Sequence, residues 1–237
     1  MIYYKSLQYE KPEGELYQYP YNLPFLQGLN DICFSTPVTI FIGENGSGKS
    51  TIIECIAELA GINLEGGSKN NKFSTYESTS ESLADSCLLV RAPKYPKDSY
   101  FYRAESYFSL MTELDKLGVS NDYFDRELHH LSRGEGFLQI IANRFFGDGV
   151  YLLDEPESGL SFQSQLSALV YIDELVKHES QFIISTHSPI LMLYPGATIY
   201  QITDDGIKEV FAKDNFLFDN WEMLINNSDQ LIHRLLR

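Results

Sequence analysis

The fold of this chain is decided by the stretch Gly43-Glu44-Asn45-Gly46-Ser47-Gly48-Lys49-Ser50. It matches the pattern G-x-x-x-x-G-K-S of a phosphate-binding loop, which needs a strand before it and a helix after it. An apolar run, residues 38–42, comes directly before the stretch. Apolar residues at helical spacing follow it and stop at Gly61. This context favours a phosphate-binding loop over a glycine-rich turn in front of an ordinary helix.

The residue types of this loop suit the binding of ATP with Mg²⁺. Glycines let backbone N–H groups approach phosphate oxygens, and the helix N-terminus adds the positive end of its dipole. Lys49 is expected to reach the β- and γ-phosphates, and the Ser50 hydroxyl is expected to bind Mg²⁺. The predicted contacts of this segment with ATP are Gly43, Asn45, Gly46, Ser47, Gly48, Lys49, Ser50 and Thr51.

A second signal is an apolar run, residues 150–153, that ends in Asp154-Glu155-Pro156. An aspartate at the end of a buried strand can hold magnesium, directly or through water, so Asp154 is a predicted metal ligand. Glu155 is placed to polarise the attacking water. The alternative is an acidic turn that caps the next helix. Beside a complete phosphate loop, we favour the catalytic interpretation.

The pattern of the remaining chain predicts an α/β fold. Runs of β-branched and aromatic residues predict strands at 32–34, 38–42, 87–91, 100–103, 150–153, 182–185 and 198–202. Helical spacing appears within 52–59, 137–145 and 162–175. Asp204-Asp205-Gly206 predicts a hairpin turn. Alternating strands and helices indicate a largely parallel core sheet.

Three further motifs follow one another along the chain, at residues 131–135, 157–161 and 185–189. Leu131-Ser132-Arg133-Gly134-Glu135 resembles the ABC signature, with Arg and Glu where transporters usually have Gly and Gln. Glu157-Ser158-Gly159-Leu160-Ser161 resembles the D-loop, and Ser185-Thr186-His187-Ser188-Pro189 resembles the switch-histidine loop. Over about residues 38–200 the chain therefore resembles ABC-type P-loop ATPase heads. Its Ser-Thr-His-Ser-Pro segment and its small size are similar to those of stand-alone predicted ATPases related to SMC, RecF and OLD-type heads.

The resemblance implies one ABC-type ATPase domain, with a nucleotide core at 1–60 and 131–237 and an inserted signature-bearing lobe at about 61–130. It also implies an ATP-dependent homodimer in which Ser132, Gly134 and Glu135 of one chain meet the ATP of the other. Glu155 and His187 would complete the hydrolytic site. Two structural alternatives stay open. Ser132 and Glu135 also fit the pattern of a helix capping box, and His187 could be an ordinary loop histidine.

One departure from the family concerns a glutamine. ABC ATPases usually carry this residue between the phosphate loop and the signature, and its side chain touches Mg²⁺ and the water. Residues 51–131 contain no glutamine. Glu105 follows a predicted strand in this interval, so we predict that it takes the place near the metal. The alternative is that Glu105 is a surface or capping residue.

Composition limits the partners. Lys and Arg total 18 and Asp and Glu total 33, which gives a net charge of −15 and disfavours autonomous binding to nucleic acid. Cys33, Cys55 and Cys87 have no neighbours at metal-ligand spacing and are expected to be reduced, as in a cytoplasmic protein. No apolar run approaches the roughly 20 residues that span a bilayer, so direct membrane insertion is not expected.

Three functions remain in competition. The first is an ATPase that acts as a dimerisation switch for an unknown protein partner. The second is the ATPase subunit of a membrane ABC transporter, which the missing glutamine and the Ser-Thr-His-Ser-Pro loop disfavour. The third is a nucleotide sensor that hydrolyses little, which Glu155 and His187 disfavour. Tyr19, Tyr21 and Phe25 could each stack on adenine, although packing explains each of them better in so aromatic a chain.

Overall fold

A mostly parallel sheet forms the centre of the molecule. The computed structural model describes residues 1–13, 18–29, 31–64, 67–68, 82–105 and 133–236. The strand order in this sheet is β10-β9-β3-β8-β7-β6-β4. Its strands are β3 (Val38–Gly43), β4 (Gly67–Ser68), β6 (Asp98–Arg103), β7 (Gly149–Asp154), β8 (Gln181–Ser185), β9 (Thr198–Thr203) and β10 (Gly206–Val210). The neighbours from β9 to β6 run parallel, and β10 and β4 pair antiparallel at the two edges.

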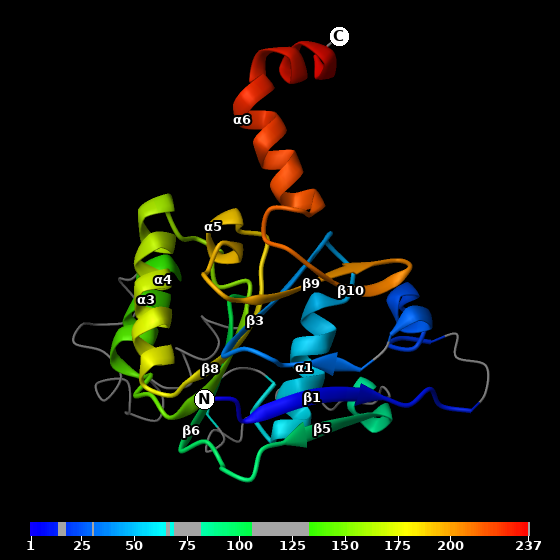
Figure 1. The fold of residues 1–237 in the computed structure, drawn as a ribbon, viewed down its shortest axis with the longest axis vertical. Helices are drawn as coiled ribbons and strands as arrows, with labels where there is room; N and C mark the ends of the chain where they lie inside the picture. Colours follow the sequence, from blue (N-terminus) through cyan, green and yellow to red (C-terminus); the bar gives the residue numbers. More distant parts are fainter. Residues whose placement is uncertain (14–17, 30, 65–66, 69–81, 106–132, 237) are drawn as a thin grey trace.

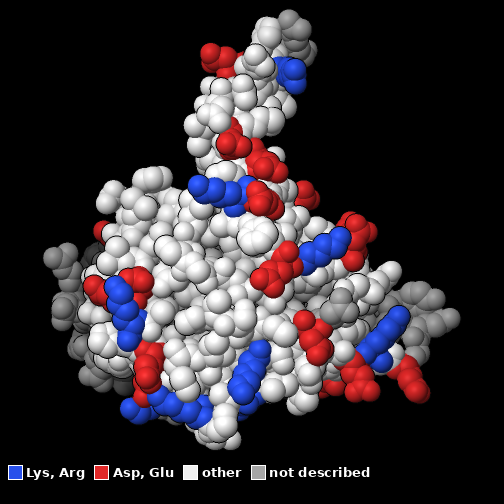
Figure 2. Space-filling model, viewed as in Figure 1, with Lys and Arg blue, Asp and Glu red and all other residues white. Residues whose placement is uncertain are grey.

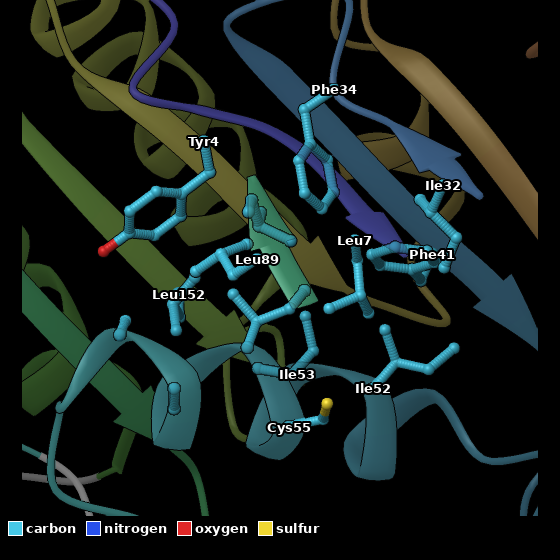
Figure 3. Packing of buried hydrophobic residues seen from close by; sticks show 14 of the residues in the cluster. Tyr4, Leu7, Ile32, Phe34, Phe41, Ile52, Ile53, Cys55, Leu89 and Leu152 are labelled. Carbon is cyan, nitrogen blue, oxygen red and sulfur yellow. The ribbon is translucent and has the colours of Figure 1, made fainter. Parts of the chain in front are cut away.

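A smaller antiparallel sheet lies on one side. It consists of β1 (Tyr4–Tyr9), β2 (Ile32–Cys33) and β5 (Cys87–Arg91), in the order β2-β1-β5. Helix α1 (Lys49–Ala60) packs against both sheets, and its apolar residues Ile52 and Ile53 point toward Leu7, Leu89 and Leu152 (Figure 3). Two short 3-10 helices, η1 (Pro24–Gly28) and η2 (Leu83–Ser86), complete this side.

The opposite face of the main sheet is covered by α3 (Arg133–Asn143) and α4 (Phe162–Lys177), with the short α5 (Pro189–Met192) beside them (Figure 1). The core between them is aromatic: the rings of Phe145 and Tyr151 stack with centroids 4.0 Å apart. Because both faces of the sheet are covered, every residue of β3, β7 and β8 is buried, and these strands are mostly apolar rather than alternating, with Thr39, Asp154, Gln181 and Ser185 as buried polar residues. This explains why the sequence revealed them so clearly.

The α/β fold predicted from the sequence is confirmed, and each predicted strand exists within a few residues of its expected bounds. The chain also contains β1, β4 and α6, which the sequence analysis did not predict. Strands β5 and β6 lie in the two core sheets, although composition had assigned their residues to the inserted lobe. The rest of that interval includes 106–132, outside the described residues, so the lobe stays a prediction.

The chain ends in α6 (Phe216–Leu235), which projects away from the body (Figure 1). The Asn215 side chain caps it by accepting hydrogen bonds from the N–H groups of Leu217 and Phe218. Asn227 has non-helical dihedral angles and divides the helix into two arms. Within the residues that the structure describes, no helix has the length and apolar character needed to cross a membrane.

Candidate nucleotide-binding site

The predicted phosphate-binding loop connects β3 to α1, as its pattern requires. Gly46 and Gly48 have φ angles of 78° and 100°, which favour glycine. A Cβ atom on Gly48 would lie 2.3 Å from the ring of Phe25, so this position also lacks space for a side chain. Gly48 is the N-cap of α1 and uses no side chain to satisfy the first N–H groups. The loop therefore presents backbone donors at a helix N-terminus, where an anion binds well.

Lys49 is buried beside this loop. Its Nζ donates hydrogen bonds to the carbonyl oxygens of Gly43 and Glu44, at 3.1 and 2.9 Å. Burial lowers the pKa of Lys49, while the nearby carboxylates of Glu155 and Asp154 oppose this shift. A cation in this position can attract the terminal phosphates of a nucleotide.

Ser50 and Asp154 meet where α1 faces the end of β7. The Ser50 hydroxyl donates to Asp154 Oδ1 at 3.0 Å, and the Ser185 hydroxyl on β8 donates to the same oxygen. Asp154 is buried, and it lies in register with Ser185 at the carboxyl ends of neighbouring parallel strands. A hydroxyl and a carboxylate oxygen side by side are hard donors of the kind that Mg²⁺ prefers.

Glu155 directly follows β7, and His187 lies two residues after the end of β8. Glu155 has a φ of 49°, and its N–H donates to the carbonyl of Ser185 at 3.1 Å. Its Oε1 is 3.6 Å from Nε2 of His187. Burial and then the charge of Lys49 lower the pKa of His187. The arrangement brings a carboxylate and an imidazole together, and such a pair can accept and relay a proton.

Glu157 has a role that the sequence analysis did not assign. Its Oε1 accepts a hydrogen bond from the backbone N–H of His187 at 2.6 Å, and its Oε2 is buried without a hydrogen-bond partner among the described residues. Burial raises the pKa of Glu157. In the sequence, Glu157 is an acidic residue at the start of the predicted D-loop, directly after Pro156. No pattern in the sequence indicates that its side chain reaches the loop of His187.

A cavity of about 410 Å³ opens over the phosphate loop. It is lined by Tyr19, Leu23, Asn45, Gly46, Gly48, Lys49, Ser50, Thr51, Glu105 and Glu155. The structure thus gathers most of the predicted contacts around one space, at the carboxyl ends of parallel strands, where α/β folds bind their ligands.

The predicted signature lies at the start of α3. Gly134 and Glu135 fall in its first turn, and Glu135 is exposed. A Cβ atom on Gly134 would lie 2.4 Å from the carbonyl oxygen of Gly159, so the signature helix contacts the backbone of the predicted D-loop directly. Ser132 lies outside the described residues, and its capping and ATP-binding interpretations both stay predictions.

Comparisons with known proteins agree with this geometry. Residues 23–117 match a family model described as "AAA domain", and residues 108–193 match one described as "AAA domain, putative AbiEii toxin, Type IV TA system". The chain is 27% identical to the energy-coupling factor transporter ATP-binding protein EcfA of Methanosphaera stadtmanae, over 93% of this chain and 87% of the relative. It is 25% identical to the iron(3+)-hydroxamate import ATP-binding protein FhuC of Bacillus subtilis, over 78% and 82%.

Solved structures share the fold. The chain aligns with cbiO1 of Clostridium perfringens, part of the ABC transporter complex cbiONQ, with a TM-score of 0.55 and 14% identity over 100% of both chains. It aligns with MJ1267, an ATP-binding cassette of an ABC transporter in its ADP conformation, with a TM-score of 0.51 and 17% identity over 96% of each. The chain is an ABC-type P-loop ATPase.

Two of the aromatic residues considered for this ATPase have structural roles. Phe25 is buried against Gly48, and Tyr21 donates to the backbone carbonyl of Ser82. Tyr19 differs from them: its side chain lies in the wall of the cavity, it is 52% exposed, and its hydroxyl is 3.0 Å from Oγ1 of Thr51. Its exposed ring can therefore contact a flat ligand in the cavity. The aromatic composition of the chain had instead favoured a packing role for Tyr19.

The interval that lacks a glutamine contributes Arg103 and Glu105 to an ion-pair cluster in this ATPase. Arg103 pairs in register with Asp154 across β6 and β7, and its Nη1 is 2.5 Å from Glu54 Oε1. Its Nη2 is 3.5 Å from Glu105 Oε2, and its Nε is 3.9 Å from Asp154 Oδ2. Glu105 is 84% exposed at the rim of the cavity, so its metal-binding role stays a prediction. Sequence analysis missed Glu54, although it lies one helical turn after Ser50.

Proposed function

We propose that this ATPase is an ATP-dependent dimerisation switch whose opening and closing act on a protein partner. One observation carries the proposal. Residues of the phosphate loop and Glu155 line one cavity, with Asp154 in contact with Ser50 and His187 in contact with Glu155, whereas among the described residues none from α3 lines the cavity. The signature at the start of α3 then serves the ATP of a second chain, as the family resemblance implies. Two ATP molecules would lie between two copies placed head to tail.

Within each site, positioning and charge carry out the chemistry. The N–H groups of the phosphate loop and Lys49 bind the β- and γ-phosphates, and Ser50 and Asp154 would hold Mg²⁺, which would neutralise the charge of the phosphates. Glu155 polarises the attacking water, and His187 contacts the γ-phosphate. Glu157 keeps the backbone of His187 in place through the 2.6 Å hydrogen bond. Tyr19 stacks on the adenine. No covalent intermediate is needed.

The test is the oligomeric state of the Glu155→Gln variant with saturating Mg-ATP. This change removes the carboxylate that polarises water and keeps the phosphate loop intact, so ATP should persist and hold two chains together. Size-exclusion chromatography with light scattering should show an increase in dimer on addition of ATP. The Lys49→Ala/Glu155→Gln double variant is the matched control and should show no ATP-dependent change. A Glu155→Gln protein whose mass does not respond to Mg-ATP would refute the switch.

A second candidate is the ATPase subunit of a membrane transporter, because the relatives EcfA and FhuC carry transporter names. The two functions differ in what the protein binds in cells. A transporter subunit would copurify with an integral membrane protein from detergent-solubilised membranes. With a net charge of −15, neither function predicts binding of the isolated protein to duplex DNA at physiological salt.

A further inference from the structure

The C-terminal helix α6 presents apolar side chains that none of the residues described by the structure covers. Its first turn is anchored by Leu217, which is buried in the core. From residue 219 onward almost every residue is exposed. The large apolar residues exposed on this helix and its end are Trp221, Met223, Leu224, Ile225, Ile232, Leu235 and Leu236. Ile225 and Leu235 are 73% and 70% exposed, so they are not partly packed on the body.

A helix of this length and composition is not expected to stand alone in water. Isolated helices shorter than about 12–15 residues are marginal, and in proteins most helical stability comes from the packing of an apolar face. The break at Asn227 divides α6 into arms that are each shorter than this limit. Trp221, Leu224 and Ile225 lie on one side of the first arm at helical spacing, as do Ile232 and Leu235 on the second. Among the described residues nothing covers them, and a second molecule packed on this face would stabilise the helix.

The charges on the helix favour a second copy of the chain. Asp219 and Glu222 lie on the first arm, and Asp229, His233 and Arg234 lie on the second. Two copies of α6 placed antiparallel about the break would set Glu222 of each beside Arg234 of the other and leave Asp229 near the break, whereas a parallel pair would place each charged residue beside its own copy. A two-fold axis near the break at Asn227 satisfies this arrangement.

A membrane surface suits the helix less well. Lipid-binding amphipathic helices carry many Lys or Arg residues on their polar face. The described part of α6 has one arginine, Arg234, against Asp219, Glu222 and Asp229. In Figure 2 the projecting helix is mostly uncharged, with its basic group near the tip.

The position of α6 agrees with a role in pairing. Phe216, at the start of the helix, lines a cleft together with Glu44 and Ser47 of the phosphate loop. The helix thus leaves the body at the end of the sheet that holds the nucleotide site (Figure 1). If the proposed function holds, this is the end at which a second copy docks.

We propose that α6 pairs antiparallel with α6 of a second copy of this chain, with Trp221 packed near the partner's Leu235 and Glu222 paired with the partner's Arg234. This contact needs no nucleotide. It tethers two chains through their C-terminal helices and keeps their nucleotide sites close together between rounds of hydrolysis.

The first test measures association of the full chain without nucleotide, by analytical ultracentrifugation over a concentration series. The wild-type chain should dimerise, and Ile225→Glu should weaken the dimer at least about tenfold, since a charge then replaces an apolar contact. Phe211→Ser is the matched control, because Phe211 is 79% exposed but lies before α6. A wild-type chain that stays monomeric, or a dimer that Ile225→Glu leaves unchanged, would overturn the proposal.

Charge reversal tests the antiparallel arrangement. Glu222→Arg and Arg234→Glu should each weaken the dimer, and the double variant should recover most of the wild-type affinity. Failure of the double variant to recover would exclude this pairing. The pairing would also be excluded if the wild-type chain bound anionic vesicles more strongly than the Ile225→Glu variant does, because α6 would then be a membrane-binding helix.

A separate measurement distinguishes this proposal from the dimerisation switch. Lys49→Ala should keep the nucleotide-free dimer while it loses the response to ATP. Because Ile225→Glu removes the nucleotide-free contact, the response to ATP is measured in the Glu155→Gln/Ile225→Glu variant. A nucleotide-free dimer that Ile225→Glu weakens, together with a Glu155→Gln/Ile225→Glu protein that stays monomeric with Mg-ATP, would refute the switch and support the pairing. A wild-type chain that is monomeric without nucleotide, together with a Glu155→Gln protein that dimerises with Mg-ATP, would do the reverse.

Discussion

The nucleotide site and the C-terminal helix are built in opposite ways. In the site, Asp154 and the phosphate loop follow strands β7 and β3, whose residues are all buried. In α6, almost every residue after the first turn is exposed. One chain holds the chemical groups of the site in place, whereas the described residues leave the apolar side chains of α6 uncovered. The difference teaches that the site is assembled within one chain, while α6 offers a surface for the proposed second copy.

The largest expected effect tests whether the site depends on single charged groups. Lys49→Ala should lower ATP turnover by roughly 10²–10³-fold, because the buried cation that meets the phosphates is lost. The melting temperature should change little, since the lysine binds only loop carbonyls in the free protein. Turnover is measured by phosphate release, with exposed Lys208→Ala as the control. Wild-type turnover in a folded Lys49→Ala protein would refute the assignment of the loop.

The next effect sharpens the comparison within α1, whose two ends both carry a glycine at positive φ. Gly48→Ala should lower the free energy of unfolding by about 1–3 kcal/mol or more, because the backbone is strained and the new Cβ collides with Phe25. Gly61→Ala should cost only about 1 kcal/mol, since nothing lies within 4 Å of its Cβ position. Urea unfolding of both variants gives the comparison. Equal losses would show that Phe25 moves aside freely.

A smaller effect is expected at the rim of the site. Glu105→Ala should raise the Mg²⁺ concentration for half-maximal hydrolysis by about tenfold or less, and Glu105→Gln should be milder. Because Glu105 is 84% exposed, neither change should alter the melting temperature. Arg103 would lose one carboxylate and keep its contact with Glu54 at 2.5 Å. A Mg²⁺ requirement identical to the wild type would make Glu105 an ordinary surface residue.

The smallest effect is expected in the projecting helix. Trp221→Ser should change the stability of the isolated monomer by no more than about 0.5 kcal/mol, since a 42% exposed side chain far from the core contributes little. The same change in the buried Phe137, whose ring packs tilted against that of Tyr102 with centroids 4.6 Å apart, should cost several kcal/mol. Thermal unfolding at low protein concentration measures both. A large loss at Trp221 would mean that the helix packs on its own body.

The elements that could be predicted from the sequence are those whose pattern is local. The strands β3 and β7 are mostly apolar because both faces are covered, and the glycines of the phosphate loop have a fixed spacing. The strand β1 was missed because its buried residues, Tyr4 and Leu7, are three positions apart and do not alternate with exposed ones, and because its partners β2 and β5 lie far away in the chain. The helix α6 was missed because Asn226, Asn227 and Ser228 interrupt its apolar pattern.

The same reasoning holds for the site. Lys49, Ser50, Asp154 and Glu155 were predicted because each belongs to a motif with a fixed spacing, and the structure brings them around one cavity. The contact of Glu157 with His187 joins residues 30 positions apart, and no local pattern encodes it. The ion pair of Arg103 with Glu54 likewise depends on the register of β6 against β7 and on the packing of α1.

The close approach of Gly134 to Gly159 has a mechanical consequence. Because no side chain would fit between these backbones, a displacement of the loop after Glu155 would press directly on the start of α3. In a head-to-tail dimer, α3 would touch one ATP while this loop is attached to the catalytic glutamate of the other. Hydrolysis at either site would then displace a contact at its neighbour, and the two ATP molecules would be consumed cooperatively rather than independently.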